Sequence, residues 1–290
     1  MKICTKCQAK FTSEDWICPA CGNVPSNVDG VPVLAPALAL SGGGFRPDAF
    51  AKLAALEHQS FWFRARNRLI VWALRRSFPR IQRYLEIGCG TGYVLEGVAK
   101  AYPETSLVGS EIFSVGLPYA ASRVKAAELI QMDARHIPYE GEFDVIGAFD
   151  VLEHIEEDEM VLEAMWRALV PGGGVVITVP QHPWLWSTSD ENACHVRRYR
   201  ITELRDKVLR AGFKLEFETS FVSLLLPAMW ASRLTKKRTK PDDDSMPELN
   251  LPNWLNRVFE IVMNIESRLI QMGLRFQLGG SRLLIATKKV

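Results

Sequence analysis

Residues of three groups in this sequence have types and spacings that could do chemistry. The first group is the run Glu86-Ile-Gly88-Cys-Gly90-Thr-Gly92, in which an acid precedes three glycines at alternate positions. Glycine accepts positive φ angles and lets the backbone approach a ligand with no Cβ in the way. The acid is badly placed for a phosphate but well placed to attract an ammonium or sulfonium group. The run therefore predicts a strand-to-helix turn that cradles a nucleotide-like ligand.

The second group is Asp150-Val-Leu-Glu153-His154, together with His195 in a later loop. Histidine suits proton removal at neutral pH because its unperturbed pKa is about 6.5, so His154 and His195 are candidate general bases. Alternatively, Asp150, Glu153 and His154, with His182 or His195, could hold Mg²⁺, which would lower the pKa of an acceptor hydroxyl. A structural role, in which Glu153 and His154 only brace the loop, stays open.

The third group is Cys4-x-x-Cys7 and Cys18-x-x-Cys21, two pairs separated by ten residues. Each pair has the spacing that places two thiolates on one tetrahedral zinc ion. Two redox dithiols would need a thioredoxin-like βαβ context, which this stretch lacks. We therefore expect a closed, structural Zn²⁺ site in a ribbon whose last strand is Val31–Leu34, and whose partner could be RNA, protein or nothing.

Several apolar runs predict the strands that must position these groups. An acid that ends the second strand, about 20 residues past the glycines, can accept both hydroxyls of a ribose, which selects Glu111 as a ribose clamp. Ligands of an open parallel sheet bind beyond the carboxyl ends of its strands, where Glu153 and His154 follow the fourth strand. The predicted strands are 85–87, 106–111, 129–133, 143–149, 175–179, 213–219 and 281–287.

With these features the chain resembles the class I S-adenosylmethionine-dependent methyltransferases. The segment His58–Asn67 and the Glu153-His154 pair further resemble ubiquinone-biosynthesis-type O-methyltransferases, some of which hold a divalent cation at that pair. The resemblance covers about residues 58–220. It implies an α/β fold with a Rossmann-like, doubly wound, seven-stranded and mostly parallel sheet. The cofactor-binding candidates are Arg66, Glu86, Gly88, Gly90, Gly92, Glu111, Ile112, Asp133, Ala134 and Phe149, with Arg66 on the cofactor carboxylate and Asp133 and Phe149 at the adenine.

The order of these features suggests four parts. We expect a zinc ribbon over 1–40, a linker and the start of a lid helix over 41–57, a methyltransferase domain over 58–221 plus 281–290, and a helical insertion over 222–280. The lid helix is predicted to run from Asp48 to Phe78. One insertion helix carries an apolar stripe of Trp254, Leu255, Val258, Val262, Ile265, Leu269 and Met272. This stripe could pack over the sheet, form a dimer interface, or form a cap for a lipid-like substrate that contacts a membrane surface.

Composition indicates a globular enzyme with no strong preference for polyanions. The formal net charge is +2, and the one locally basic run is Lys236–Lys240, so RNA is a weaker expectation than a small acceptor. The first 21 residues lack a secretory signal, which favours the cytoplasm. We expect methyl transfer to an oxygen, less readily a nitrogen, of a small or lipid-like acceptor. The alternatives are a ribosomal RNA base methyltransferase that uses the ribbon to bind RNA, and a non-catalytic cofactor-binding or protein-docking module.

Overall fold

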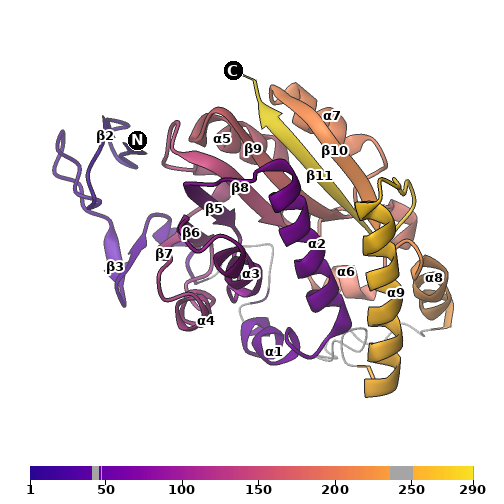
Figure 1. Ribbon diagram of the computed structural model, residues 1–290. Coiled ribbons are helices and arrows are strands. Elements are labelled where there is room, and N and C mark those ends of the chain that lie inside the picture. Colours follow the sequence, from indigo (N-terminus) through magenta and orange to yellow (C-terminus); the bar gives the residue numbers. More distant parts are fainter. Residues whose placement is uncertain (41–45, 47, 236–250, 290) are drawn as a thin grey trace.

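The computed structural model describes residues 1–40, 46, 48–235 and 251–289 (Figure 1). Residues 41–45 and 47 of the predicted linker and the basic run at 236–240 lie outside the described residues. No helix within the described part of the chain is both long and apolar enough to cross a membrane.

One sheet organises the molecule, with strand order β10-β11-β9-β8-β5-β6-β7-β4-β3. The central strands run parallel, whereas β11 is antiparallel to both β9 and β10. The seven predicted strands are therefore present in the order of a doubly wound sheet. They are β5 (Arg83–Ile87), β6 (Ser106–Glu111), β7 (Glu128–Gln131), β8 (Phe143–Phe149), β9 (Leu169–Pro180), β10 (Phe213–Phe221) and β11 (Ser281–Lys288).

The sheet has nine strands rather than seven because the ribbon adds β4 (Val31–Val33) and β3 (Ser26–Val28) to its edge. β4 pairs in parallel with β7, and the backbone N–H of Leu34 donates to the carbonyl of Gln131 at 2.8 Å. The Gln131 side chain bonds both main-chain groups of Ala35. An edge strand presents unpaired N–H and C=O groups, so the ribbon strand satisfies part of the β7 edge.

Helices cover both faces of the sheet (Figure 1). Residues of α2 (Phe61–Ser77), α3 (Tyr93–Ala101), α4 (Leu117–Arg123) and α9 (Asn253–Gln271) share one apolar core. Residues of α5 (Asp158–Ala168) and α7 (Glu203–Arg210) share the other. Side chains alternate between the faces of a strand, so Tyr84 of β5 joins the first core and its neighbour Leu85 the second.

The lid segment forms two helices, so the prediction of one helix over 48–78 was wrong. α1 (Ala49–Leu56) and α2 are separated at Ser60, whose backbone is extended with φ −79° and ψ 131°. Between them lies Glu57, which accepts a hydrogen bond from the Thr91 hydroxyl at 2.6 Å and pairs with Arg123 at 2.6 Å. The helix is therefore interrupted between Leu56 and Phe61, next to the buried Glu57 carboxylate that bonds Thr91 of the glycine turn.

The ribbon begins with a hairpin of β1 (Lys2–Ile3) and β2 (Lys10–Phe11). Trp16 packs edge-on against Tyr139 of the larger domain, with ring centroids 5.5 Å apart. Short helices complete the described structure. They are η1 (Pro36–Leu38), η2 (Ala134–His136), η3 (Leu152–His154), η4 (Pro183–Leu185), α6 (Thr188–Asn192) and α8 (Leu226–Thr235).

Helix α9 packs against α2 with its polar side, so of the three alternatives for its apolar stripe, packing over the sheet is not the one that forms. Glu260 pairs with Arg64 and Arg68 of α2, and Asn264 accepts from Arg68 at 2.8 Å. Met263 and Ile270 supply the buried apolar contacts of this side. Much of the predicted stripe instead faces outward, since Trp254 is 69% and Met272 is 75% exposed.

Candidate active site

The glycine turn after β5 has the conformation that the sequence predicted. Gly88, Gly90 and Gly92 have φ angles of +62°, +55° and +79°, in the left-handed region that disfavours other residues. A Cβ on Gly88 would lie 2.5 Å from Val151 Cγ2, and one on Gly92 would lie 2.8 Å from the Ala120 Cα. These two positions therefore have no room for a side chain.

Glu111 ends β6 beside this turn. Its carboxylate accepts backbone N–H bonds from Gly90 at 3.0 Å, Ile112 at 2.9 Å and Phe113 at 3.2 Å. Burial raises the pKa of Glu111, although these bonds act in the opposite direction. An ionised carboxylate offers about four lone-pair sites, so the three bonds orient Glu111 and leave capacity for a ligand hydroxyl.

Glu86, the acid before the glycines, is buried at the end of β5. The Tyr84 hydroxyl donates a hydrogen bond to it at 3.3 Å. Burial raises the pKa of Glu86 to about 8, while that hydrogen bond and the Arg66 charge oppose the shift. A cationic group placed nearby would therefore favour the charged carboxylate.

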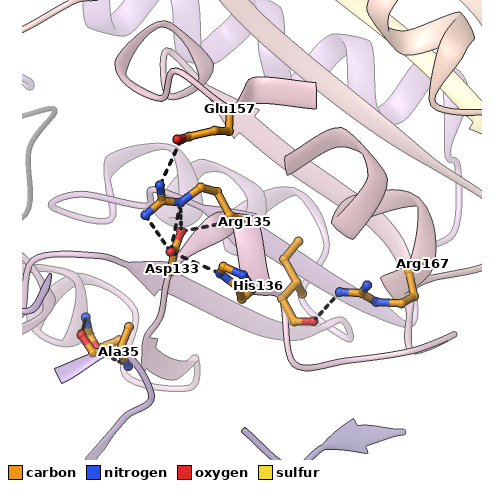
Figure 2. A network of polar contacts seen from close by, with 8 residues as sticks. Ala35, Asp133, Arg135, His136, Glu157 and Arg167 are labelled. Carbon is orange, nitrogen blue, oxygen red and sulfur yellow. Dashed lines mark hydrogen bonds and ion pairs between the residues drawn. The ribbon is translucent and has the colours of Figure 1, made fainter. Parts of the chain in front are cut away.

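Asp133 follows β7 and is held by its own neighbours, as Figure 2 shows. Both of its oxygens accept from Arg135 Nε at 3.0 Å, and Arg135 also bonds Glu157 at 3.0 Å. Burial acts to raise the pKa of Asp133, but the Arg135 bonds outweigh it and lower the pKa. The Asp133 carboxylate, which was predicted to lie at the adenine, thus already bonds Arg135, which was not among the candidate residues.

Arg66 of α2 is buried beside the residue that follows β8. It forms an ion pair of 2.6 Å with Asp150 and stacks over the Trp62 ring at 4.9 Å. Asp150 has a φ of +56°, an uncommon value for a residue other than glycine. This pairing ties the lid helix to the end of β8, where the second chemical group begins.

Glu153, His154 and His195 come together although 40 residues separate the pair from His195. One ligand atom of each lies within 4.8 Å of the others, and the two imidazole rings meet edge-on at 4.8 Å. Glu153 is fully buried, and burial followed by the Asp150 charge raises its pKa well above the usual range. The sequence-predicted catalytic residues therefore share one location.

The structure adds Asp190 to this cluster. Its carboxylate lies 2.9 Å from His195 Nδ1 and accepts from Arg198 Nε at 2.6 Å. Burial would raise the pKa of Asp190, but its contacts with His195 and Arg198 lower it to about 2. The sequence placed Asp190 in a long loop, and its spacing of five residues from His195 carries no general signal.

His182 does not join the cluster, so its proposed metal-binding role was wrong. It is buried, has a φ of +66° and stacks on Trp184 at a centroid distance of 5.3 Å. Asp150, the other proposed ligand, is paired with Arg66. The remaining donors are two imidazoles and one carboxylate, whereas Mg²⁺ prefers oxygen ligands. This donor set does not suit Mg²⁺.

A cavity of about 1260 Å³ joins the predicted cofactor and catalytic residues. Of the cofactor-binding candidates, Gly92 alone is absent from its lining. Glu153, His154 and His195 also line this cavity. The insertion contributes apolar residues to the lining, namely Val222, Leu225, Ala228, Met229, Leu251, Leu255 and Phe259. One space is therefore large enough for a nucleoside cofactor and an acceptor together.

The four ribbon cysteines fit a structural zinc ion. All four are free thiols, and the Sγ atoms of Cys4 and Cys21, and of Cys7 and Cys18, are 3.7 Å apart. Zn–S bonds of about 2.3 Å in a tetrahedron separate sulfurs by about 3.8 Å. Backbone N–H groups of Cys7 and Lys6 lower the pKa of Cys4 to about 6. The backbone of Asn23 acts to lower the pKa of Cys21, but the neighbouring thiols and burial raise it to about 12.

The doubly wound sheet, the glycine turn and the acid at the end of β6 define the Rossmann-like fold of the class I methyltransferases. A methyltransferase domain family matches residues 55–217, and the chain belongs to this family.

Known relatives agree with this assignment. The chain is 23% identical to a protein of Mycolicibacterium smegmatis named as a probable S-adenosylmethionine-dependent methyltransferase, over 57% of this chain and 63% of that protein. It is 30% identical to a ubiquinone biosynthesis O-methyltransferase of Pseudomonas aeruginosa, over 39% of this chain and 50% of that protein. The chain thus spans less than two thirds of the length of either relative.

Among solved structures, the [4+2]-cyclase SpnF superposes with a TM-score of 0.55 and 20% identity, over 79% of this chain and 84% of that one. This neighbour is a cyclase, so the shared fold alone does not determine the reaction.

Proposed function

We propose that this chain transfers the methyl group of S-adenosylmethionine to an oxygen of a small apolar or lipid-like acceptor. The observation that carries the proposal is one cavity whose lining includes the cofactor candidates other than Gly92 together with Glu153, His154 and His195. A neutral hydroxyl is a weak nucleophile that becomes much stronger on losing its proton, whereas the lone pair of a neutral amine is already strongly nucleophilic. The cluster of titratable groups therefore favours oxygen over nitrogen.

The residues divide the work between binding and proton removal. When bound, S-adenosylmethionine supplies an electrophilic methyl carbon on a sulfonium sulfur. Glu111 would hold the ribose hydroxyls, Glu86 would face the positive charge, and Arg66 would hold the carboxylate by exchanging its pairing with Asp150. Alignment of the acceptor oxygen with the methyl carbon supplies most of the rate enhancement, and the histidine cluster takes the proton.

The insertion supports an apolar acceptor. Apart from Ser232 and Gly280, its residues in the cavity wall are apolar, and they come from α8, α9 and the segments next to these helices. We assign residues 222–280 the role of a substrate cap. The outward face of α9 supports contact with a lipid surface, because exposed Ile261 and Ile265 lie within one turn of exposed Arg257 and Arg268. Apolar side chains beside cations are typical of helices that lie on anionic membranes.

Membrane contact is tested by flotation with phosphatidylcholine vesicles that contain 30 mol% phosphatidylglycerol. We expect wild type to float, and Ile265→Glu to float several-fold less because it puts a charge into the apolar face. Leu209→Glu is the matched control, since Leu209 of α7 is 46% exposed and Ile265 is 47% exposed. Equal flotation of both variants and wild type would remove lipid contact from the proposal.

Methyl transfer itself is tested with [methyl-¹⁴C]S-adenosylmethionine and a protein-free cell extract that is divided into lipid, small-molecule and RNA fractions. We expect calorimetric binding of the cofactor and alkali-stable label in the lipid or small-molecule fraction. Label confined to RNA and lost after RNase treatment would instead support the ribosomal RNA alternative. Cofactor binding without label in any fraction would support a non-catalytic module.

A further inference from the structure

The loop after β9 holds a pair of a buried carboxylate, Asp190, and an imidazole, His195, that lines the cavity. Asp190 lies at the third position of α6, and Ser187 caps this helix by bonding the Asp190 carboxylate through its backbone N–H at 2.8 Å and its hydroxyl at 3.1 Å. The other oxygen of Asp190 lies 2.9 Å from His195 Nδ1. The loop therefore fixes the carboxylate before the imidazole meets it.

Arg198 keeps this carboxylate in place and charged. Its Nε donates to the same Asp190 oxygen at 2.6 Å, and both side chains are buried. A second donor of Arg198 reaches the Gln181 carbonyl at 3.3 Å. A buried carboxylate with these partners remains an acceptor, so the His195 nitrogen beside it is the one that carries hydrogen.

The opposite nitrogen of His195 points into the catalytic cluster. His195 Nε2 lies 3.9 Å from a Glu153 oxygen, and the His195 ring meets His154 edge-on. His195 lines the cavity, and the backbone N–H of Val196 donates to the Glu153 carbonyl at 2.8 Å. The loop is thus bonded to the segment after β8, which holds the imidazole at the cavity.

We propose that Asp190 is a positioning residue that holds His195 in the Nδ1–H form, and that His195 Nε2 removes the proton of the acceptor hydroxyl. This inference rests on the proposed function. As the acceptor oxygen bonds the methyl carbon, the carbon–sulfur bond breaks with its electron pair remaining on sulfur, and the hydroxyl proton moves to Nε2. Asp190 stabilises the resulting imidazolium, which then returns the proton to water. S-adenosylhomocysteine and the methyl ether are the products.

The tautomer is tested without any acceptor, by ¹⁵N NMR of the full-length protein labelled at histidine. The signal that disappears in His195→Gln belongs to His195. We expect a protonated Nδ1 and a bare Nε2 in wild type, and loss of that pattern in Asp190→Asn. A bare Nδ1 in wild type, or the same tautomer in both proteins, would overturn the positioning role.

The catalytic part is tested by a double-mutant cycle of kcat, with the fractionated cell extract as the acceptor source. We expect Asp190→Asn alone to lower kcat by about 10²-fold. Added to His195→Gln it should have no further effect on kcat, because Asp190 acts through His195. If the kcat of the double variant falls by the product of the two single losses, Asp190 has only a structural role. Glu191→Gln is the matched control, since Glu191 is exposed, adjacent in sequence and absent from the cavity lining.

Failure of the inference and failure of the proposed function remain distinguishable. Unchanged calorimetric binding of S-adenosylmethionine in all variants shows that the cofactor site is intact. If no fraction of the extract accepts label, the methyl-transfer proposal fails, and with it the catalytic part of this inference. The NMR measurement still decides whether Asp190 orients His195.

Discussion

Glu86 and Glu111 are both buried carboxyls at the ends of neighbouring strands, yet their surroundings differ. Glu111 receives three backbone N–H bonds, whereas Glu86 is stabilised by the Tyr84 hydroxyl at 3.3 Å, the Arg66 charge and the backbone of Leu95. These contacts do not offset the burial of Glu86, whose pKa stays raised. A cationic ligand would therefore stabilise the charged form of Glu86, and this effect can be measured.

Affinity for S-adenosylmethionine should increase with pH up to about 8. Burial raises the Glu86 pKa to about 8, so the free protein carries mostly a neutral carboxyl at pH 7, and cation binding must release its proton. The gain should be at most about tenfold per pH unit and should level off above that pKa. Calorimetry at pH 6, 7, 8 and 9 measures it.

Glu86→Gln is the reference for this experiment because the ligand's own amino group also titrates in this range. That titration affects both proteins equally, so the ratio of their affinities isolates Glu86. A ratio that stays constant from pH 6 to 9 would show that Glu86 does not meet the cation.

Gly92→Ala should lower the free energy of unfolding by more than the conformational strain of a left-handed backbone accounts for. Gly92 and Gly141 both have positive φ, and replacing either by alanine costs about 1–2 kcal/mol of conformational strain. Only at Gly92 would the new Cβ also meet backbone, at 2.8 Å from Ala120, whereas at Gly141 nothing lies within 4 Å. Urea unfolding should show a larger loss for Gly92→Ala, and calorimetry should show weakened cofactor binding for this variant alone. Equal losses would mean that Ala120 moves away at no cost.

At the scale of elements, helix α9 completes helix α2. Ser60 makes no side-chain cap at the start of α2, and Asn256 of α9 takes that place. Its Oδ1 accepts from the Phe61 N–H at 2.7 Å, and its Nδ2 donates to the Gln59 carbonyl at 2.6 Å. The insertion therefore helps to position the helix that carries Arg66.

Asn256→Ala should lower the free energy of unfolding by about 1 kcal/mol, the usual cost of losing a helix cap. Asn264→Ala is the comparison, because Asn264 bonds the exposed Arg68 side chain and caps no helix. We expect this second variant to lose less than half as much in urea unfolding. A similar loss in both would indicate that α9 contributes by packing and not by capping.

The sequence predicted elements best where the signal is local. Apolar runs and the glycine turn located all seven strands from 83 onward, because both are local features of the chain. The packing of α9 could not be predicted, because its polar residues meet Arg64 and Arg68, which lie almost 200 positions earlier. Glu57 and Arg123 were missed for the same reason, since they lie 66 positions apart. Asp190 was missed although its partners lie in its own loop, because their spacing matches no general motif. The pairing of β4 with β7 also depends on an edge that only the folded sheet has.

At the scale of the whole molecule, the ribbon is connected to the cofactor side of the cavity. After β4 the chain runs through η1, where Leu38 lines the cavity and the Ala39 carbonyl accepts from the Ser114 N–H at 3.1 Å. Ser114 follows the Glu111–Phe113 turn, whose backbone N–H groups orient the Glu111 carboxylate. The path from Cys21 to Ser114 thus consists of one short sheet extension and one hydrogen bond, and the proposed zinc ion would hold its far end.

Zinc removal should therefore weaken cofactor binding although none of the four ribbon cysteines lines the cavity. A small ribbon with few buried apolar residues depends on its metal for folding, and its loss would release β4 and the Ala39 contact. We expect Cys18→Ser, or chelation confirmed by colorimetric zinc release, to raise the Kd for S-adenosylmethionine several-fold, and added Zn²⁺ to restore the chelated wild type but not the variant. Because Glu111 keeps its own backbone donors, binding should be weakened and not abolished. An unchanged Kd after complete zinc release would mean that the ribbon and the cofactor site fold independently.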